Sequence, residues 1–268
     1  MPHVNSHPHG DFAWYDLFTK DIAASKSFYA GLSGWTAQDQ PNENEGSEPY
    51  SMFLHDGRPI GGVGQMNAEM LEGGAPQSWN VYVTVNELEP VLARVEEHGG
   101  KVIFPAMDVL DVGRLAYFTD PEGAILALWQ PKKNIGAGVV DEPGTVCWVE
   151  LASRDIKAAC DFYANVFGWT NSEPPHEVPS GYRMLKNGEK DIGGTLQMTE
   201  EWGEMPAHWS VYFEVEDMPM VASRVTELGG ELKFGPFDSP VGQIAVCADD
   251  GGAHFYMMEL TDAMKANR

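Results

Sequence analysis

One segment occurs twice in the sequence, and this repeat restricts the fold more than any other feature. Phe12–Thr36 reads FAWYDLFTKDIAASKSFYAGLSGWT, and Val146–Thr170 reads VCWVELASRDIKAACDFYANVFGWT. The two copies align without a gap, so that Trp14 matches Trp148. A chain that repeats so long a segment is expected to contain two domains of one fold.

Each copy has the pattern of a strand followed by a helix. The side chains of residues 13–18 fall into two alternating sets, Trp14, Asp16 and Phe18 in one and Ala13, Tyr15 and Leu17 in the other. This is the period of a strand with two different faces. Asp21 and Asp155 come next, and a short carboxylate can accept hydrogen bonds from the free amides of a first helical turn. Gly34 and Gly168 stand where a helix needs a left-handed residue to end. The unit is therefore predicted to fold as strand, helix and strand.

A second, related unit follows in each half of the chain. We expect strands at 50–54 and 59–66, a loop at 69–77, a strand at 79–85, a helix at 88–98, and strands at 101–104, 115–119 and 125–129. Ile60-Gly61-Gly62 recurs as Ile192-Gly193-Gly194, and residues 79–85, WNVYVTV, recur as residues 209–215, WSVYFEV. The chain is thus predicted to be an α+β protein of four βαβββ modules. Two modules would close a curved mixed sheet around a cleft, with the helices outside.

The domain boundaries follow from this repeat and from composition. We expect a flexible tail at residues 1–10, one domain at 11–131, a Gly- and Pro-bearing linker at 132–144 and a second domain at 145–262. The tail contains His3, His7 and His9. Such a tip can collect transition metals, although a frayed terminus is the simpler interpretation.

Charge excludes two classes of partner. Asp and Glu number 40 against 17 Lys and Arg, which gives a formal net charge of −23. This potential repels phosphate backbones and anionic lipid head groups, so neither nucleic acid nor a membrane surface is an expected partner. A solvated acidic surface explains the charge more simply than a role in binding cations. The sequence shows no membrane span and no secretory signal, and its three cysteines suit reduced thiols, so a cytoplasmic location is expected.

The motifs together resemble the vicinal oxygen chelate superfamily, which includes glyoxalase I, extradiol dioxygenases, and bleomycin and fosfomycin resistance proteins. The resemblance rests on a first strand with Leu17 four residues before Asp21, on Phe28-Tyr29 in the helix, on Gly34-Trp35, and on the turn at residues 120–124, DPEGA. In its tandem arrangement the chain is similar to two-domain glyoxalase-like proteins of bacteria.

This resemblance implies a divalent metal, held by His, Gln or Glu on the first and last strands of the modules. The corresponding positions here are Trp14, Trp148, Asn80, Ser210, Ala127 and Tyr256, with a further position near Gln65 and Gln197. Indole and methyl groups cannot bind a metal, and Asn and Ser are poor ligands alone. We therefore predict no usual metal centre and no cofactor, while a divalent metal at non-standard residues stays an alternative.

The residues expected to line the clefts are aromatic and acidic. The predicted ligand-binding set is Trp14, Asn80, Tyr82, Trp148, Ser210, Tyr212, Tyr256 and His254. Asp16 and Glu150 lie beside the tryptophans and are the candidate catalytic residues, because burial brings the pKa of a carboxyl group towards working pH. The alternative is that each carboxylate is hydrogen-bonded and only fixes the sheet. His254 and His208 could bind a ligand, although histidines in such positions are more often structural. Arg114, which follows Gly113, would either contact an anionic substrate or be solvated.

Two functional hypotheses follow. The first is a glyoxalase-like protein that binds a small organic molecule in aromatic clefts without a usual metal centre. The second is an enzyme of the superfamily, a lyase, isomerase, hydroxylase or dioxygenase, with a cleft carboxylate as base or a metal at non-standard residues. The two domains are also candidates for pairing with each other as a pseudo-dimer, in a monomer or a homodimer.

Overall fold

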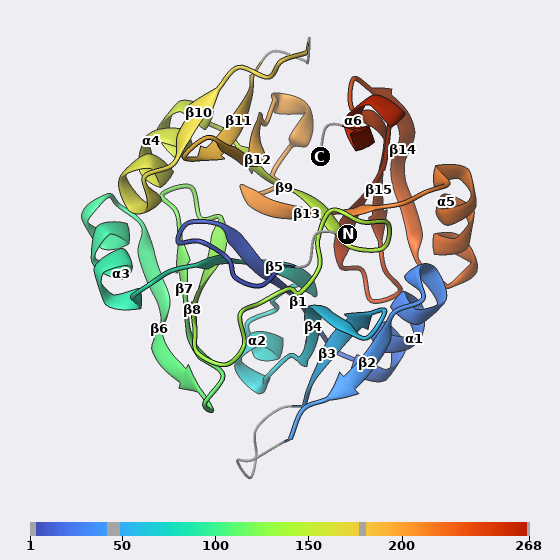
Figure 1. The fold of residues 1–268 in the computed structure, drawn as a ribbon, viewed down its shortest axis with the longest axis horizontal. Coiled ribbons are helices and arrows are strands. Elements are labelled where there is room, and N and C mark those ends of the chain that lie inside the picture. Colours follow the sequence, from blue (N-terminus) through green and yellow to red (C-terminus); the bar gives the residue numbers. More distant parts are fainter. Residues whose placement is uncertain (1–3, 42–48, 177–180, 267–268) are drawn as a thin grey trace.

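The computed structural model of the protein describes residues 4–41, 49–176 and 181–266, and Figure 1 shows their fold. The first half contains strands β1 (Phe12–Thr19), β2 (Thr36–Asp39), β3 (Tyr50–His55), β4 (Arg58–Gln65), β5 (Ser78–Thr84), β6 (Lys101–Val109), β7 (Gly113–Thr119) and β8 (Ile125–Pro131). The second half contains β9 (Val146–Ser153), β10 (Thr170–Ser172), β11 (Tyr182–Asn187), β12 (Lys190–Gln197), β13 (His208–Glu214), β14 (Glu231–Ser239), β15 (Gly242–Ala248) and β16 (His254–Leu260). The helices are α1 (Ile22–Ser33), α2 (Ala68–Glu72), α3 (Leu88–Glu97), α4 (Ile156–Phe167), the 3₁₀ turn η1 (Glu200–Trp202), α5 (Met218–Glu227) and α6 (Asp262–Ala266).

The strands form two eight-stranded mixed sheets with the same topology. The first has the order β2-β3-β4-β1-β5-β8-β7-β6, and the second has the order β10-β11-β12-β9-β13-β16-β15-β14. β1 is parallel to β4 and antiparallel to β5, and β9 is likewise parallel to β12 and antiparallel to β13. The two modules of one domain therefore share one sheet, which confirms the α+β fold of two tandem domains.

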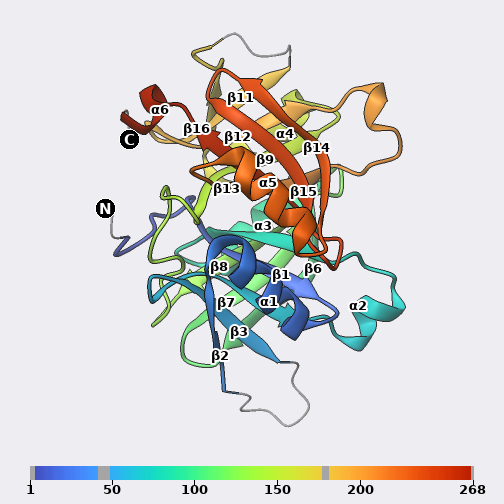
Figure 2. The ribbon, with the colours of Figure 1, turned by 90° about the vertical axis from the view of Figure 1, so that its right-hand side faces the viewer.

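The two sheets lie back to back. In Figure 1 they curve away from each other above and below, with α3 and α4 on the left and α1 and α5 on the right; the turned view in Figure 2 places the second sheet above the first. Phe213 of β13 contacts Trp79 of β5 and Trp35 across the centre, with ring centroids 5.2 Å apart in both pairs. The concave face of each sheet, called the cleft of its domain, points outward.

The helices that flank the sheets also join the domains. Tyr29 of α1 donates a hydrogen bond from its hydroxyl to Asp249 of the second domain, at 3.1 Å. Tyr163 of α4 does the same to Asp120 of the first domain, also at 3.1 Å. Both tyrosines are fully buried in a hydrophobic core that runs through both domains. The domains are thus related as the halves of a pseudo-dimer.

Residues 4–10, expected to be a flexible tail, lie against the rest of the chain. The backbone amide of Val4 donates to Gly138, the imidazole of His7 contacts the carbonyl of Ala137 at 2.9 Å, and the indole of Trp169 donates to Gly10 at 2.8 Å. The linker makes the matching contact, because the indole of Trp35 donates to the carbonyl of Gly144 at 2.7 Å. Each segment before a first strand is therefore held by the other domain.

Two local predictions differ from the structure. Residues 69–77, expected to be a loop, include the end of the short helix α2, whose first turn is capped by the side chain of Asn67. β6 continues past Phe104 to Val109, because a bulge between Phe104 and Met107 accommodates Pro105 in an edge strand. None of the helices within the described residues is long and apolar enough to cross a bilayer.

Candidate functional site

One rung of the first sheet carries a row of aromatic side chains on the concave face. Trp14 of β1 pairs with Tyr82 of β5, Tyr82 with Ala127 of β8, Ala127 with Tyr117 of β7, and Tyr117 with Phe104 of β6. Partners in register point to the same face of a sheet. The ring centroids of Tyr82 and Tyr117 are 5.6 Å apart, and those of Tyr117 and Phe104 are 6.3 Å apart. The small Ala127 leaves the room that Tyr117 fills.

The second domain has the same rung with different residues at two positions, Tyr256 in place of Ala127 and Val246 in place of Tyr117. Trp148 pairs with Tyr212, Tyr212 with Tyr256, Tyr256 with Val246, and Val246 with Phe234. The tyrosine has moved from the β7 position to the neighbouring β16, where Tyr256 stacks on Tyr212 with centroids 4.4 Å apart. Each cleft therefore keeps a tryptophan, two tyrosines and an exposed phenylalanine at the edge strand.

Asp16 is buried beside this row in the first domain. Asp16 is 3% exposed, and the hydroxyl of Tyr82 donates a hydrogen bond to its Oδ2 at 2.8 Å. The hydroxyl of Tyr117 contacts that of Tyr82, so a chain of two phenols ends on the carboxyl group. Burial raises the pKa of Asp16 to about 7, while the hydrogen bond from Tyr82 and the nearby amide of Asn80 act in the opposite direction. Asp16 is thus a carboxyl group that changes charge near neutral pH.

The other oxygen of Asp16, Oδ1, is buried and accepts no hydrogen bond from the described residues. Asn80 lies directly across from Asp16 in the sheet. Its amide, however, donates to the backbone carbonyls of Asp16 and Ser78, both at 3.3 Å. This atom is thus a polar group of the cleft that lacks a partner among the described residues, and a buried acceptor without a donor is costly.

Glu150 occupies the matching position in the second domain, and neither of its carboxyl oxygens is buried without a partner among the described residues. The hydroxyl of Tyr212 donates to Oε1 at 2.7 Å, and the hydroxyl of Tyr182 also binds the carboxyl group. Burial raises the pKa of Glu150, and these two hydrogen bonds lower it. Ser210 lies across from Glu150 in the sheet and bonds to Tyr256. The extra methylene of Glu150 lets its carboxyl group reach both tyrosines.

Two site residues, Tyr50 and Tyr182, were missed by the sequence argument. The hydroxyl of Tyr50 accepts a hydrogen bond from the indole of Trp14 at 2.9 Å, and Tyr182 accepts one from Trp148 at 3.0 Å. Each hydroxyl lies over a glycine of β4 or β12, and a Cβ on that glycine would stand 1.9 Å from it. The signal was present, because both the Gly-Gly pairs and the tyrosines recur in the two halves.

Tyr117 was also missed, since the second domain has valine at that position and the repeat gives no hint of it. The structure brings Trp14, Asp16, Asn80 and Tyr82 together, and it does the same with Trp148, Glu150, Ser210, Tyr212 and Tyr256. His254 stands apart at the exposed start of β16. Burial, Lys233 and His208 lower its pKa, and no hydrogen bond joins it to the tyrosine row among the described residues.

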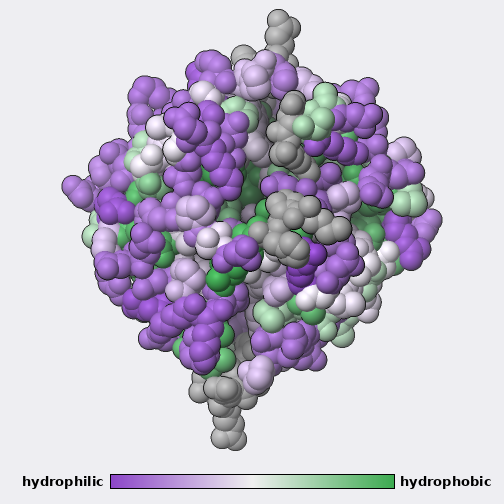
Figure 3. Space-filling model, viewed as in Figure 1, coloured by the Kyte–Doolittle hydropathy of each residue, from purple (hydrophilic) through white to green (hydrophobic). Residues whose placement is uncertain are grey.

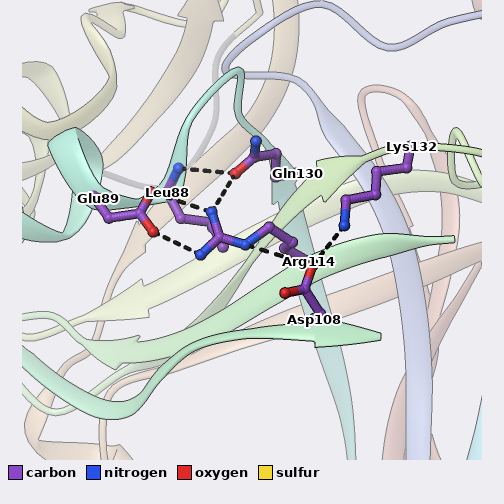
Figure 4. Close-up of polar contacts among 6 residues, drawn as sticks. All are labelled: Leu88, Glu89, Asp108, Arg114, Gln130 and Lys132. Atoms are coloured by element: carbon purple, nitrogen blue, oxygen red, sulfur yellow. Dashed lines mark hydrogen bonds and ion pairs between the residues drawn. The ribbon is translucent and has the colours of Figure 1, made fainter. Parts of the chain in front are cut away.

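Arg114 is tied into an ion-pair cluster and does not face the cleft. Figure 4 shows its guanidinium between Glu89, at 2.6 Å, and the side-chain oxygen of Gln130, at 3.2 Å, with Asp108 3.9 Å away. Arg114 lies three residues before Tyr117 on β7, which puts it on the opposite face of the sheet. Its expected role at a cleft mouth is therefore not supported by this geometry.

The residues at the positions where the superfamily resemblance places a metal do not fit a divalent ion. The first strands bring indoles, and the last strands bring the methyl group of Ala127 and a phenol. Gln65 donates from its amide to the carbonyl of Lys20 at 2.8 Å, so it is held by the backbone. Across the described part of the chain, no group of three or more His, Cys, Asp or Glu side chains is arranged to hold a metal. No reaction step through a metal follows from these residues.

A separate hollow of about 330 Å³ lies beneath the N-terminal segment, between Val4–Pro8 and the strands β9 and β12. Tyr15, Cys147, Trp148 and Lys190 are among the residues that line it. Of the predicted site residues, it includes Trp148. In Figure 3 hydrophilic residues cover most of the face on which this segment lies, with hydrophobic side chains visible in the depressions.

Comparison with known proteins agrees with this architecture. A family model described as Glyoxalase/Bleomycin resistance protein/Dioxygenase superfamily matches residues 11–128, and one described as Glyoxalase-like domain matches residues 148–258. The chain is 36% identical to the Mycobacterium tuberculosis (strain CDC 1551 / Oshkosh) protein named "Putative glyoxylase CFP32", over 97% of this chain and 98% of that protein. It is also 36% identical to "Anthracycline biosynthesis protein DnrV" of Streptomyces peucetius, over 95% of this chain and 94% of that protein.

Solved structures share the fold at low identity. The 2,3-dioxygenase LapB from Pseudomonas sp. KL28 superposes with a TM-score of 0.63 at 14% identity, over 94% of this chain and 93% of that chain. The Mn(II)-bound glyoxalase from Novosphingobium aromaticivorans gives a TM-score of 0.62 at 16% identity, over 95% of this chain and 84% of that chain. The chain therefore belongs to the glyoxalase/bleomycin resistance protein/dioxygenase superfamily and carries two of its domains in tandem.

Proposed function

We propose that this protein binds a small organic molecule in an aromatic cleft, without the usual metal centre of its superfamily. The observation that carries the proposal is the row of rings that leads from an exposed phenylalanine to a buried carboxyl group. Aromatic walls with a few fixed polar groups are typical of small-molecule sites, in which the rings supply contact area and the polar groups orient the ligand. A relative named for anthracycline biosynthesis agrees with a small organic ligand.

A test of this proposal separates ligand binding from metal binding. Full-length protein is purified without a His-tag, dialysed against EDTA, and screened by thermal shift against aldehydes, thiol adducts, catechols and polycyclic phenols. The proposal expects at least one class to raise the melting temperature without added metal, because a ligand that binds only the folded state stabilises it. Elemental analysis that finds one tightly held divalent ion per domain, with binding that needs this ion, would overturn the proposal.

A second candidate function, general-base catalysis, is favoured by one observation. The raised pKa of Asp16, about 7, suits a group that removes a proton from a bound substrate at neutral pH, and the phenols of Tyr82 and Tyr117 orient that group. Asp16→Asn and Glu150→Gln test this role once a turned-over substrate is known. Turnover that survives both substitutions excludes a carboxylate base, whereas loss in Asp16→Asn alone places the base in the first domain.

A further inference from the structure

We infer that the cleft of the first domain is the one that binds, and that it takes a flat, largely apolar molecule whose hydroxyl group donates a hydrogen bond to Oδ1 of Asp16. This inference rests on the proposed function and specifies its site and ligand chemistry. Three features of the cleft support it: an unpartnered acceptor, a row of rings that reaches solvent, and the contrast with the second domain.

The unpartnered acceptor is one oxygen of the Asp16 carboxyl group. Oδ1 of Asp16 is buried without a donor among the described residues, while Oδ2 of the same carboxyl group is held by Tyr82 at 2.8 Å. The carboxyl group is therefore fixed in orientation with one oxygen unused. A ligand that donates to this oxygen removes a penalty that the free protein carries, so its hydrogen bond is worth more than an exchange with water.

The rings determine the shape of molecule that this face of the sheet would accept. Phe104 is 43% exposed on the edge strand, and Tyr82, which touches Asp16, is 2% exposed. Tyr117 lies between them, 6.3 Å from the ring of Phe104 and 5.6 Å from that of Tyr82. A flat apolar body can lie along such a row, since aromatic groups pack well in edge and offset geometries. Its polar end then meets the carboxyl group.

The second domain lacks both of these features. Tyr212 donates a hydrogen bond to Glu150, and neither carboxyl oxygen of Glu150 is buried without a partner among the described residues. The ring of Tyr256 stacks on Tyr212 at 4.4 Å, and Val246 stands where the first domain has Tyr117. The row of rings is therefore interrupted between Phe234 and Tyr256, and its inner end is closed by protein side chains.

The number of available acceptors selects the polar group of the ligand. A hydroxyl group has one hydrogen to donate, which one unused oxygen satisfies. An ammonium group has three hydrogens and would leave two without partners in a buried site. A carboxylate would be repelled by Asp16 and by a chain with a net charge of −23. A phenol or alcohol fits this cleft best.

The experiment uses two probes that differ only in the donor. 2-Naphthol carries a hydroxyl group on a flat ring system, and 2-methoxynaphthalene has the same rings without the hydrogen. Titration calorimetry on the full chain at pH 8, where Asp16 is mostly ionised, is expected to give one 2-naphthol per chain. It should bind on the order of tenfold more tightly than the methyl ether, as one hydrogen bond to a buried acceptor predicts.

Matched variants in the two domains locate the site. Asp16→Ala should weaken 2-naphthol binding by about tenfold and leave the methyl ether nearly unchanged, whereas Glu150→Ala should change neither by more than about twofold. The comparison of the two probes on the unmodified chain keeps the test decisive if Asp16→Ala fails to fold. Equal affinity for both probes, loss of binding in Glu150→Ala, two bound molecules per chain, or no binding of 2-naphthol would each overturn the inference.

Failure here is distinct from failure of the proposed function. If the metal-free protein binds members of the ligand panel but shows no preference for the hydroxyl group and no dependence on Asp16, only the inference falls. If nothing in the panel binds without a metal, the proposed function falls with it.

Discussion

Asp16 and Glu150 show how one methylene group divides two otherwise similar sites. Both carboxyl groups are buried beside a tryptophan and face a tyrosine of the neighbouring antiparallel strand. The longer side chain reaches a second tyrosine, and the shorter one leaves an oxygen unpaired. Because desolvation penalises the charged form, the carboxyl group with an unpaired buried oxygen carries the larger cost when it ionises. The ionised form of Asp16 is thus the less well stabilised of the two carboxylates.

The raised pKa of Asp16 predicts a loss of stability as pH rises. Between its ordinary pKa near 4 and its folded value of about 7, the folded chain holds a proton that the unfolded chain has released. Unfolding then releases a proton, so the free energy of unfolding falls as pH increases through this window and levels off above it. Between pH 5 and pH 7.5 this group should account for a loss of about 2 kcal/mol.

Urea denaturation of the wild type and of Asp16→Asn, at pH 5 and at pH 7.5, measures this contribution. The neutral amide cannot ionise, so the variant should lose about 2 kcal/mol less than the wild type over this interval. Asp262→Asn, on the exposed helix α6, is the control and should follow the wild type. Equal losses in wild type and Asp16→Asn would show that Asp16 ionises normally in the folded chain.

At this scale the sequence predicted about half of the residues that the structure brings together in the candidate site. The two-residue period placed Trp14 and Asp16 on one face, and the repeat identified Tyr82 as their neighbour. The pairing of Tyr82 with Asp16 needed the register of β1 against β5, which alternation alone does not fix. Tyr50 and Tyr117 come from strands distant in the chain, so their approach to Asp16 depends on how the sheet closes.

Among the elements, the pairing of β3 with β4 determines the shape of the cleft. Met52 pairs with Gly62, and the ring of Tyr50 crosses the strand so that its hydroxyl covers this glycine and meets Trp14. The second domain repeats the arrangement with Tyr182 and Gly194. The glycines were recognised in the sequence as a repeat, but their purpose, to make room for a phenol on the concave face, required the structure.

The first element-scale prediction concerns Gly62→Ala. The new Cβ would stand 1.9 Å from the Tyr50 hydroxyl and 2.4 Å from its ring, so the whole side chain must move and Trp14 loses its acceptor. Overpacking of this kind costs about 1–3 kcal/mol. Chemical denaturation should show this loss for Gly62→Ala and a similar one for Gly194→Ala, where the contact is the same.

Gly138→Ala is the matched control for these variants. Its Cβ would have no atom closer than 3.6 Å, and its backbone needs no left-handed conformation. It should stay within about 0.5 kcal/mol of the wild type. A stable Gly62→Ala protein with the fluorescence of Trp14 unchanged would mean that Tyr50 does not occupy the position described.

For the whole molecule, the decisive feature is that one helix of each domain, α1 or α4, also packs against the other domain. The repeat predicted two domains and four modules, and the strand order confirmed the fold, but the sequence could not say how the domains meet. The Phe28-Tyr29 pair was recognised as a motif of the unit. Its packing against Phe255 and Asp249 of the other domain depends on contacts between surfaces that no local pattern encodes. The same holds for the N-terminal segment, whose partners include Trp169 of the second domain.

These contacts of α1 and α4 with the other domain predict that the two domains unfold together. The Tyr29 hydroxyl accepts from Trp79 at 2.8 Å and donates to Asp249, and Tyr163 repeats this with Trp209 and Asp120. In Tyr29→Phe the indole and carboxylate lose a buried partner, which costs about 1–3 kcal/mol. Calorimetry should show one transition for the wild type, a single transition at lower temperature for Tyr29→Phe, and separation into two in the double variant Tyr29→Phe/Tyr163→Phe.

Tyr82→Phe is the control, because it removes a buried hydroxyl within one domain. It should lower the transition temperature without splitting the transition. Two transitions in the wild type, or an unaffected double variant, would contradict the coupling.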